Sequence, residues 1–264
     1  MPYLPNALNS TRLQAAIEGG RRPAEIRRLA ALWWPKSNSD SAPTLTHKTE
    51  ELIWMATLLF VGTGKPGRKP RLDFFLVHVL NMTLFMPSIL KLIPTVESKE
   101  RLLRAMLPVV LMTVEVRGRP RINPALCMSY TATPRPPVSK DTPLPVPHPG
   151  AVTDPRDPES ASVWPTILAS VVHAPDAHTV KAVRLLFYAA QEYGMTPPGA
   201  IPGAYFSSGK RQGGETHVGL AEVDGSLFIR AAGVVMDMMG WVTHGQAPGN
   251  WDSSALGWDD AWKE

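Results

Sequence analysis

Four polar side chains interrupt an otherwise apolar stretch between Arg71 and Ile93. They are Asp73, His78, Asn81 and Ser88. At about 100° per residue of α-helix, the four positions fall within one arc of roughly 140°. A neutral imidazole can accept and return a proton near neutral pH, so the stripe could serve acid-base chemistry. The alternative is a buried histidine that donates to a neighbouring helix, and the residues alone favour this second interpretation.

A basic, glycine-rich loop from Gly62 to Pro70 precedes this stretch and contains Lys65, Arg68 and Lys69. Such loops can cradle phosphate groups. Counted from Gly62, however, Arg68 stands where a nucleotide phosphate loop needs Lys, and Lys69 stands where Ser or Thr would hold magnesium. Two interpretations remain: a solvated loop, or a basic mouth for an anionic ligand such as a phosphorylated cofactor.

The elements that position these residues are predicted to be helices, because apolar residues recur at helical spacing and alternating strand patterns are nearly absent. We expect an all-α fold, a bundle of about seven to nine helices with a long proline-rich connection. One expected helix ends at Gly19 and a second opens at Pro23. The others are expected from Thr46 or Thr49 to Gly62, from Arg71 to Ile93, from a Thr95 cap to Gly118, from Ala161 to Val172, from an Asp176 cap to Tyr193, and from Asp224 or Ser226 to Gly240.

The domain organisation is expected to be a single helical domain over residues 1–264. Within it, residues 1–44 form a peripheral N-terminal segment with modest amphipathic helices. Residues 133–160 form a mobile proline-rich loop, because nine prolines occur between Thr133 and Pro158. That density excludes a helix or a central strand.

The composition excludes several classes of function. The formal net charge is +4 over 264 residues and the basic residues are scattered, so we expect no nucleic-acid partner. Cys127 is the sole cysteine, which excludes an intramolecular disulfide and a cysteine-based metal cage. No flavin or dinucleotide motif follows a strand. His173 and His178 flank Pro175 without a completing ligand set, so no metal site is evident and a surface or capping role is favoured for both.

The N-terminus lacks the basic start and apolar core of a secretory signal. The nearest approach to a membrane span is Leu72 to Ile93, which Asp73, His78, Asn81 and Lys91 interrupt. Charged groups within a span are costly, so a buried core helix is favoured and membrane association is not expected. We therefore expect a cytoplasmic location. The oligomeric state is not indicated.

Several blocks of this sequence resemble the questin oxidase-like family. They are Glu50 to Trp54, Gly64 to Pro70, Leu72 to His78, Arg117 to Arg121, Ser129 to Thr131, Lys181 to Tyr193 and Gly257 to Trp262. The resemblance covers roughly Leu45 to the C-terminus. Members of the family are longer on the N-terminal side and carry further histidines there, so the resemblance implies the C-terminal part of the family only.

The resemblance implies an oxidoreductase that opens an anthraquinone-type aromatic polyketide by Baeyer-Villiger-like oxygen insertion in secondary-metabolite biosynthesis. It implies reduced nicotinamide (NADPH) as a possible cofactor. In this interpretation a helical pocket binds the flat aromatic substrate, and a phenol is deprotonated or oriented there. The expected catalytic residues are His78, Asn81 and Tyr130, the expected substrate-binding residues are Asp73, Ser88 and Arg119, and the expected cofactor-binding residues are Lys65, Arg68 and Lys69.

A second interpretation comes from another class of protein. Because the N-terminal part of the family is expected to be absent, the chain could be a non-catalytic, truncated helical protein that binds an aromatic ligand or a partner chain. Consumption of NADPH and oxygen would separate the enzyme from the binding protein.

Overall fold

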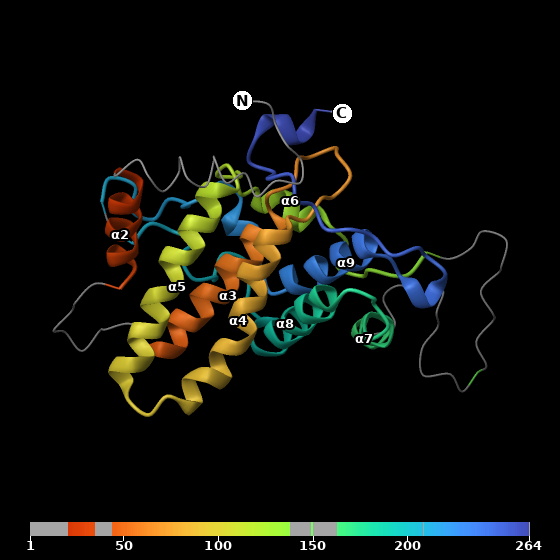
Figure 1. The fold of residues 1–264 in the computed structure, drawn as a ribbon, viewed down its shortest axis with the longest axis horizontal. Helices are drawn as coiled ribbons and strands as arrows, with labels where there is room; N and C mark the ends of the chain where they lie inside the picture. The colour runs from red at the N-terminus through yellow and green to blue at the C-terminus, as the bar shows by residue number, and fades with distance from the viewer. Residues whose placement is uncertain (1–20, 35–43, 138–148, 150–162, 208, 264) are drawn as a thin grey trace.

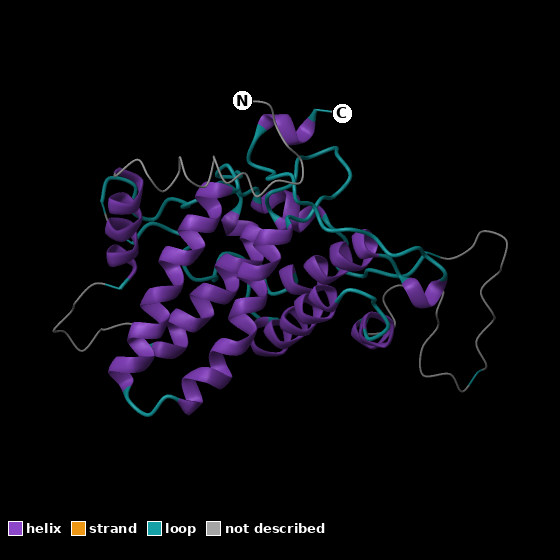
Figure 2. Ribbon diagram, in the orientation of Figure 1, coloured by secondary structure: helices purple, strands orange, loops and turns teal. Residues whose placement is uncertain are grey.

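The computed structural model describes residues 21–34, 44–137, 149, 163–207 and 209–263. Over these ranges the chain forms eight α-helices and three short 3-10 turns, and no strand is formed (Figure 2). β-type pairing among them is limited to two isolated bridges, Asp73 with Asp252 and Tyr205 with Glu215. The all-α prediction is therefore confirmed.

The helices follow one another with short connections in the first half of the chain (Figure 1). Their bounds are α2 (Arg21–Trp33), α3 (Leu45–Val61), α4 (Phe74–Leu92), α5 (Val96–Val116), α6 (Pro124–Ser129), α7 (Trp164–Val171), α8 (Ala177–Tyr193) and α9 (Leu227–Met239). The 3-10 turns are η1 (Leu220–Glu222), η2 (Val242–His244) and η3 (Asp259–Trp262).

Helix starts were predicted well where a capping side chain was recognised. Thr95 caps α5 and Asp176 caps α8, as expected. Helix α3 begins earlier than expected because Thr44 accepts the hydrogen bond from the His47 N–H. Helix α4 begins later than expected, because Asp73 is its N-cap and not one of its residues. The expected helix ending at Gly19 and most of the proline-rich stretch fall outside the described ranges.

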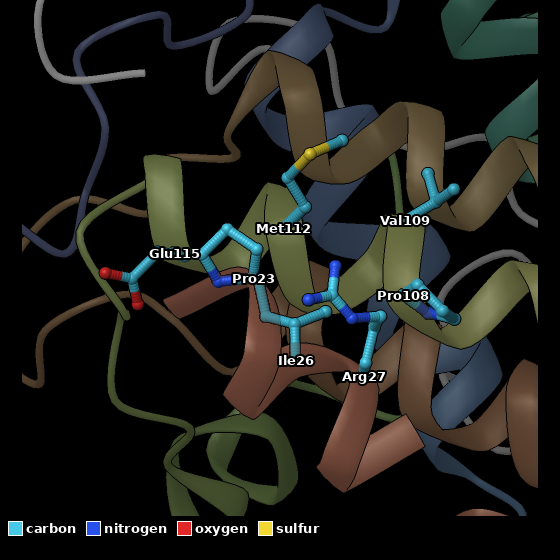
Figure 3. A pocket seen from close by; sticks show the side chains of 7 residues that line it. All are labelled: Pro23, Ile26, Arg27, Pro108, Val109, Met112 and Glu115. Atoms are coloured by element: carbon cyan, nitrogen blue, oxygen red, sulfur yellow. The ribbon is translucent and has the colours of Figure 1, made fainter. Parts of the chain in front are cut away.

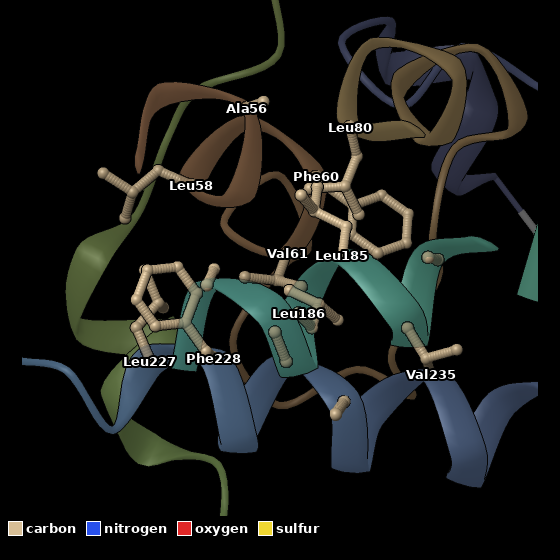
Figure 4. Packing of buried hydrophobic residues seen from close by; sticks show 14 of the residues in the cluster. Ala56, Leu58, Phe60, Val61, Leu80, Leu185, Leu186, Leu227, Phe228 and Val235 are labelled. Atoms are coloured by element: carbon tan, nitrogen blue, oxygen red, sulfur yellow. The ribbon is translucent and has the colours of Figure 1, made fainter. Parts of the chain in front are cut away.

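Helices α3 and α4 form an antiparallel pair at the centre of the bundle, joined by the basic loop (Figure 1). Helix α5 packs against both, α8 packs on α4, and α9 packs on α8. In Figure 4, Phe60 of α3, Leu80 of α4 and Leu185 of α8 meet in the core, with Phe228 of α9 below them. Each of these side chains is fully buried. This apolar contact between distant helices is the main stabilising term of the fold.

Helix α4 is the one helix of the described chain that is long and apolar enough to cross a membrane. It packs against α3, α5 and α8, and eight of its residues, including Leu80 and Asn81, are buried. Its C-terminal half exposes Phe85, Ile89 and Leu92. A core helix shows the same length and composition, so α4 gives no clear membrane span.

The C-terminal segment is fastened to the start of α4 by Arg71. Its guanidinium donates to the Asp252 carboxylate at 2.6 Å, to Ser254 Oγ at 2.8 Å and to the Ala261 carbonyl at 2.6 Å. It also lies over the Trp262 ring, 4.8 Å from the centroid. One arginine thus fixes several turns of the C-terminal chain beside the basic loop.

Candidate functional site

Three aromatic rings meet at the surface where the first turns of α4 and α8 lie together. We call Phe74, His78 and His178 the ring cluster. The His78 and His178 centroids are 4.8 Å apart, and Phe74 lies 4.7 Å from His78 and 5.1 Å from His178. His78 is exposed and the His178 side chain is 26% exposed. A ligand can therefore reach both imidazoles from solvent.

Hydrogen bonds fix the orientation of both imidazoles. His78 Nδ1 lies 2.7 Å from the Phe74 carbonyl oxygen, one turn back along α4. His178 Nδ1 lies 3.0 Å from Asp176 Oδ1. A carbonyl or carboxylate oxygen only accepts, so each Nδ1 carries the proton and each neutral ring keeps its lone pair on Nε2. The pair thus presents two oriented proton acceptors side by side.

Asp176 is a carboxylate suited to support a protonated His178. Burial acts to raise the pKa of Asp176, but hydrogen bonds from the backbone N–H and the ring of His178 outweigh burial and hold that pKa below its usual value. An ionised carboxylate on Nδ1 orients an imidazole and stabilises the imidazolium that forms when Nε2 takes a proton. His178 therefore has a carboxylate on Nδ1 that can stabilise its imidazolium, whereas His78 has only a carbonyl there.

Asp73 has a structural role at the start of α4. Its carboxylate has no exposed surface, accepts from the Phe75 and Leu76 N–H groups at 2.8 and 3.3 Å, and pairs with Arg117 at 2.7 Å. A substrate could touch it only by breaking this pair. We therefore assign Asp73 to positioning α4 and not to the substrate contacts predicted from the sequence.

The other two members of the predicted polar stripe separate in space. Asn81 is 6% exposed, and neither its amide nitrogen nor its amide oxygen has a hydrogen-bond partner among the described residues. Ser88 is exposed and lies ten residues beyond His78, about 15 Å along the helix. The shared arc is therefore divided between a surface histidine, a buried amide and a distant hydroxyl.

Tyr130 lies under the basic loop. A methyl group placed on Gly64 would be 3.7 Å from its hydroxyl, and Arg230 of α9 donates to its carbonyl oxygen. Burial, together with the nearby Cys127, raises the pKa of Tyr130 to about 12. The phenol therefore stays a hydrogen-bond donor at neutral pH, as an oxyanion partner requires.

The raised pKa of Tyr130 predicts a loss of stability at alkaline pH. An unfolded phenol titrates near pH 10, so between about pH 10 and 12 the native state holds a proton that the unfolded state loses. The free energy of unfolding must then fall as pH rises. We expect the urea unfolding midpoint of the wild type to drop from pH 8 to pH 11, and the midpoint of Tyr130→Phe to drop less. Tyr205→Phe, at an exposed phenol, should drop like the wild type, and equal drops in all three proteins would contradict the prediction.

The predicted cofactor residues lie at the same end of α4 as the ring cluster (Figure 1). Lys65, Arg68 and Lys69 are exposed on the loop between α3 and α4. Lys65 Nζ lies 5.1 Å from the Trp262 ring centroid and 3.9 Å from Asp259. Arg119, predicted to bind substrate, is exposed at the end of α5 and lies 3.7 Å from Glu115. The loop keeps the basic character that an anion needs.

A small hollow of about 160 Å³ lies between α3 and the segment that carries Ile201 and η1. Trp54, Met55 and Leu58 form its apolar wall, and Glu51 and His217 stand at its rim. Glu51 already accepts from Lys48 at 2.8 Å and from the Trp33 indole at 2.5 Å. The hollow can take a small apolar ring, but its carboxylate is already engaged.

The sequence predicted a helix cap at Asp176 and a surface or capping role for His178, and neither residue was predicted to belong to the site. The capping role of Asp176 is confirmed, because it accepts from the His178 backbone N–H at 2.6 Å. The unused signal was the Asp-x-His spacing, which lets one carboxylate cap the helix and hold the ring. The described residues contain no group of three possible metal ligands. The site consists of two imidazoles and the Asp176 carboxylate.

Fold and site together define an all-α protein with an oriented histidine pair at its surface. The questin oxidase-like family model matches residues 4–186, well over half of the 264 residues. The chain belongs to the questin oxidase-like family, and this membership indicates an oxidoreductase. The match begins ahead of Leu45 and ends before Gly257, and it includes both histidines and Asp176. A search of curated proteins found no match.

Proposed function

We propose that the chain is an oxidase of questin oxidase type that opens the ring of an anthraquinone-type polyketide by Baeyer-Villiger-like oxygen insertion. The observation that carries the proposal is the oriented pair of His78 and His178, each with Nδ1 held by an acceptor and Nε2 left basic. Such a base can take the proton of a phenol-bearing substrate. We place this reaction in secondary-metabolite biosynthesis in the cytoplasm.

In the proposed reaction, a phenol of the substrate lies against the ring cluster and gives its proton to His178 Nε2. Asp176 stabilises the resulting imidazolium. In its protonated form, His78 donates a hydrogen bond to the phenolate oxygen. In its neutral form, His78 accepts a hydrogen bond from the phenol and orients it. The phenolate raises electron density in the ring and favours attack on oxygen. One oxygen atom enters between the carbonyl carbon and the ring carbon and gives a lactone. The other oxygen atom leaves as water, which needs two electrons and a hydrogen from NADPH and one proton from solvent. Hydrolysis of the lactone by a water molecule then opens the ring to a carboxylic acid and a phenol.

The basic loop fits a phosphorylated nicotinamide by charge, because Lys65, Arg68 and Lys69 are three exposed cations on the loop that leads into α4. These residues would hold the phosphate groups. Bound NADPH would supply the two electrons that reduce the second oxygen atom to water. Tyr130, beneath the same loop, remains a neutral donor for an oxyanion.

The test is consumption of oxygen and NADPH in the presence of an anthraquinone with a free phenol. We expect consumption of both in a one-to-one ratio. His78→Ala should lower the rate about tenfold, less than the 10²- to 10⁴-fold of a positioned acid-base group, because His78 only assists His178. His173→Ala, at an exposed histidine outside the ring cluster and outside the hollow beside α3, is the matched control and should keep full activity. Equal rates for the wild type and His78→Ala would remove His78 from the mechanism.

A second candidate function is favoured by the apolar hollow beside α3. There Trp54, Met55 and Leu58 could hold a small aromatic ring without any reaction. The chain would then be a non-catalytic protein that binds an aromatic ligand. Binding of an anthraquinone without consumption of oxygen or NADPH, and loss of that binding in Met55→Glu, would favour this function over the oxidase.

A further inference from the structure

A groove runs between α2 and α5, on the opposite side of α5 from α4, which carries the ring cluster. One part, of about 240 Å³, is lined by Ile26, Val109 and Met112 with Arg27 and Pro108. Figure 3 shows Glu115 at one end of this part and Pro108 with Val109 at the other. A second part, of about 390 Å³, shares Arg27 and Pro108 with the first. We call the two parts together the α2–α5 groove.

The second part of the groove is cationic. It is lined by Arg27, Arg104 and Trp34, with small alanines between them. The Arg104 guanidinium lies over the Trp34 ring at 5.5 Å, and its Nε is buried without a hydrogen-bond partner among the described residues. Its nearest described carboxylate, Glu100, is 3.9 Å away. Arg104 thus faces this part with Glu100 as its ion-pair partner among the described residues, and Arg27, which lines both parts, adds a second guanidinium.

The other end of the groove is apolar and closed by a carboxylate. Ile26, Val109 and Met112 supply aliphatic walls, although Val109 and Met112 remain partly exposed. Glu115 at the end is engaged by Arg22 at 3.2 Å. A ligand with one anionic head and one aliphatic body is therefore oriented by the groove, with its head toward Arg27 and Arg104.

We propose that the α2–α5 groove binds a medium-chain aliphatic carboxylate. Its carboxylate accepts hydrogen bonds from Arg27 and Arg104, in the fork geometry that arginine offers to carboxylates. Its chain lies along Ile26, Val109 and Met112. Met112 lies eight positions beyond Arg104, about 12 Å along the helix, which a medium chain spans and a short acid does not. This site is independent of the oxidase proposed above.

The test is calorimetric titration of the full chain with decanoate and with decyltrimethylammonium, which has a comparable tail and the opposite charge. We expect decanoate to bind at least tenfold more tightly than the cation. Arg27→Met and Arg104→Met should each weaken decanoate binding at least fivefold. Arg101→Met, at an exposed arginine of α5 outside the groove, is the matched control and should bind as the wild type does.

Met112→Glu tests the tail, because a carboxylate in the apolar part should weaken decanoate binding without touching the arginines. His178→Ala should leave decanoate binding unchanged, which separates this site from the catalytic proposal. Equal binding of anion and cation, or equal losses in Arg101→Met and Arg104→Met, would overturn the proposal. So would a dimer in sedimentation that Met112→Glu dissociates while decanoate fails to bind, because a second copy would then fill the groove.

Discussion

Arg117→Met is expected to lower the free energy of unfolding by about 3 to 5 kcal/mol, the cost of removing one partner from a buried ion pair. The Arg117 side chain is 4% exposed and Asp73 is 0% exposed. Arg117 Nε donates to both Asp73 oxygens at 3.0 and 2.8 Å, and its guanidinium lies 4.3 Å from the Phe75 ring centroid. Without the guanidinium, the Asp73 carboxylate is left buried and uncompensated. Urea unfolding at pH 7 measures the effect.

Two comparisons make this prediction specific to the pair. Arg119→Met removes an exposed arginine two residues away and should cost less than about 1 kcal/mol, as surface pairs do. Burial raises the pKa of Asp73, and Arg117 opposes that shift. Removing Arg117 should therefore favour the protonated carboxyl in the native state, so Arg117→Met should regain stability relative to the wild type as pH falls from 8 to 5. A loss below 1 kcal/mol, or one independent of pH, would show that the pair does not hold α4.

The helices could be predicted from the sequence because periodicity and caps are local properties. Thr95 and Asp176 lie directly before apolar repeats, and each accepts a hydrogen bond from the turn that it caps. Asp73 shows the limit of this reasoning. Its position in an apolar run suggested a residue on a helix face, whereas the chain uses it as the cap itself. A cap and a stripe residue look alike until the first hydrogen bond of the helix is known.

The site could be predicted only in part, because its members are far apart in sequence. His78 was recognised on α4, but its neighbour His178 is one hundred residues away on α8, and no spacing rule connects them. Arg117 likewise meets Asp73 across 44 positions. Helix packing decides such pairs, through side chains like Leu80 and Leu185 that set how α4 lies on α8.

The Asp73–Arg117 ion pair and the ring cluster are connected through consecutive residues at the start of α4. Asp73 caps the helix, and the next residue, Phe74, supplies both the carbonyl that holds His78 Nδ1 and a ring of the cluster. The Asp252 carboxylate accepts from the Arg71 guanidinium at 2.6 Å, and the Asp252 carbonyl oxygen accepts from the Phe74 N–H at 2.7 Å. Phe74, whose carbonyl holds His78, is thus fixed by the buried Asp73 on one side and by the paired Asp252 on the other.

His178→Ala is expected to lower turnover of a phenolic anthraquinone by about 10² to 10⁴ fold, the range of a positioned acid-base group. The loss should exceed that of His78→Ala, because only His178 has a carboxylate on Nδ1, at 3.0 Å. Asp176→Asn keeps an oxygen to cap α8 but removes the charge, so it should lower turnover without a large change in melting temperature. His173→Ala, at an exposed histidine before α8, is the matched control and should retain activity.

A substrate analogue separates a base from a structural histidine in this experiment. An anthraquinone with all phenols methylated has no proton to give, so the wild type should turn it over slowly and His178→Ala should lower that rate little further. If His178→Ala lowers turnover of the phenol and its methyl ether by the same factor, His178 positions the substrate and does not take its proton. The carboxylate on Nδ1 would then serve only to hold the ring, and the basic Nε2 of His78, held by a carbonyl alone, would be the remaining proton acceptor in the ring cluster.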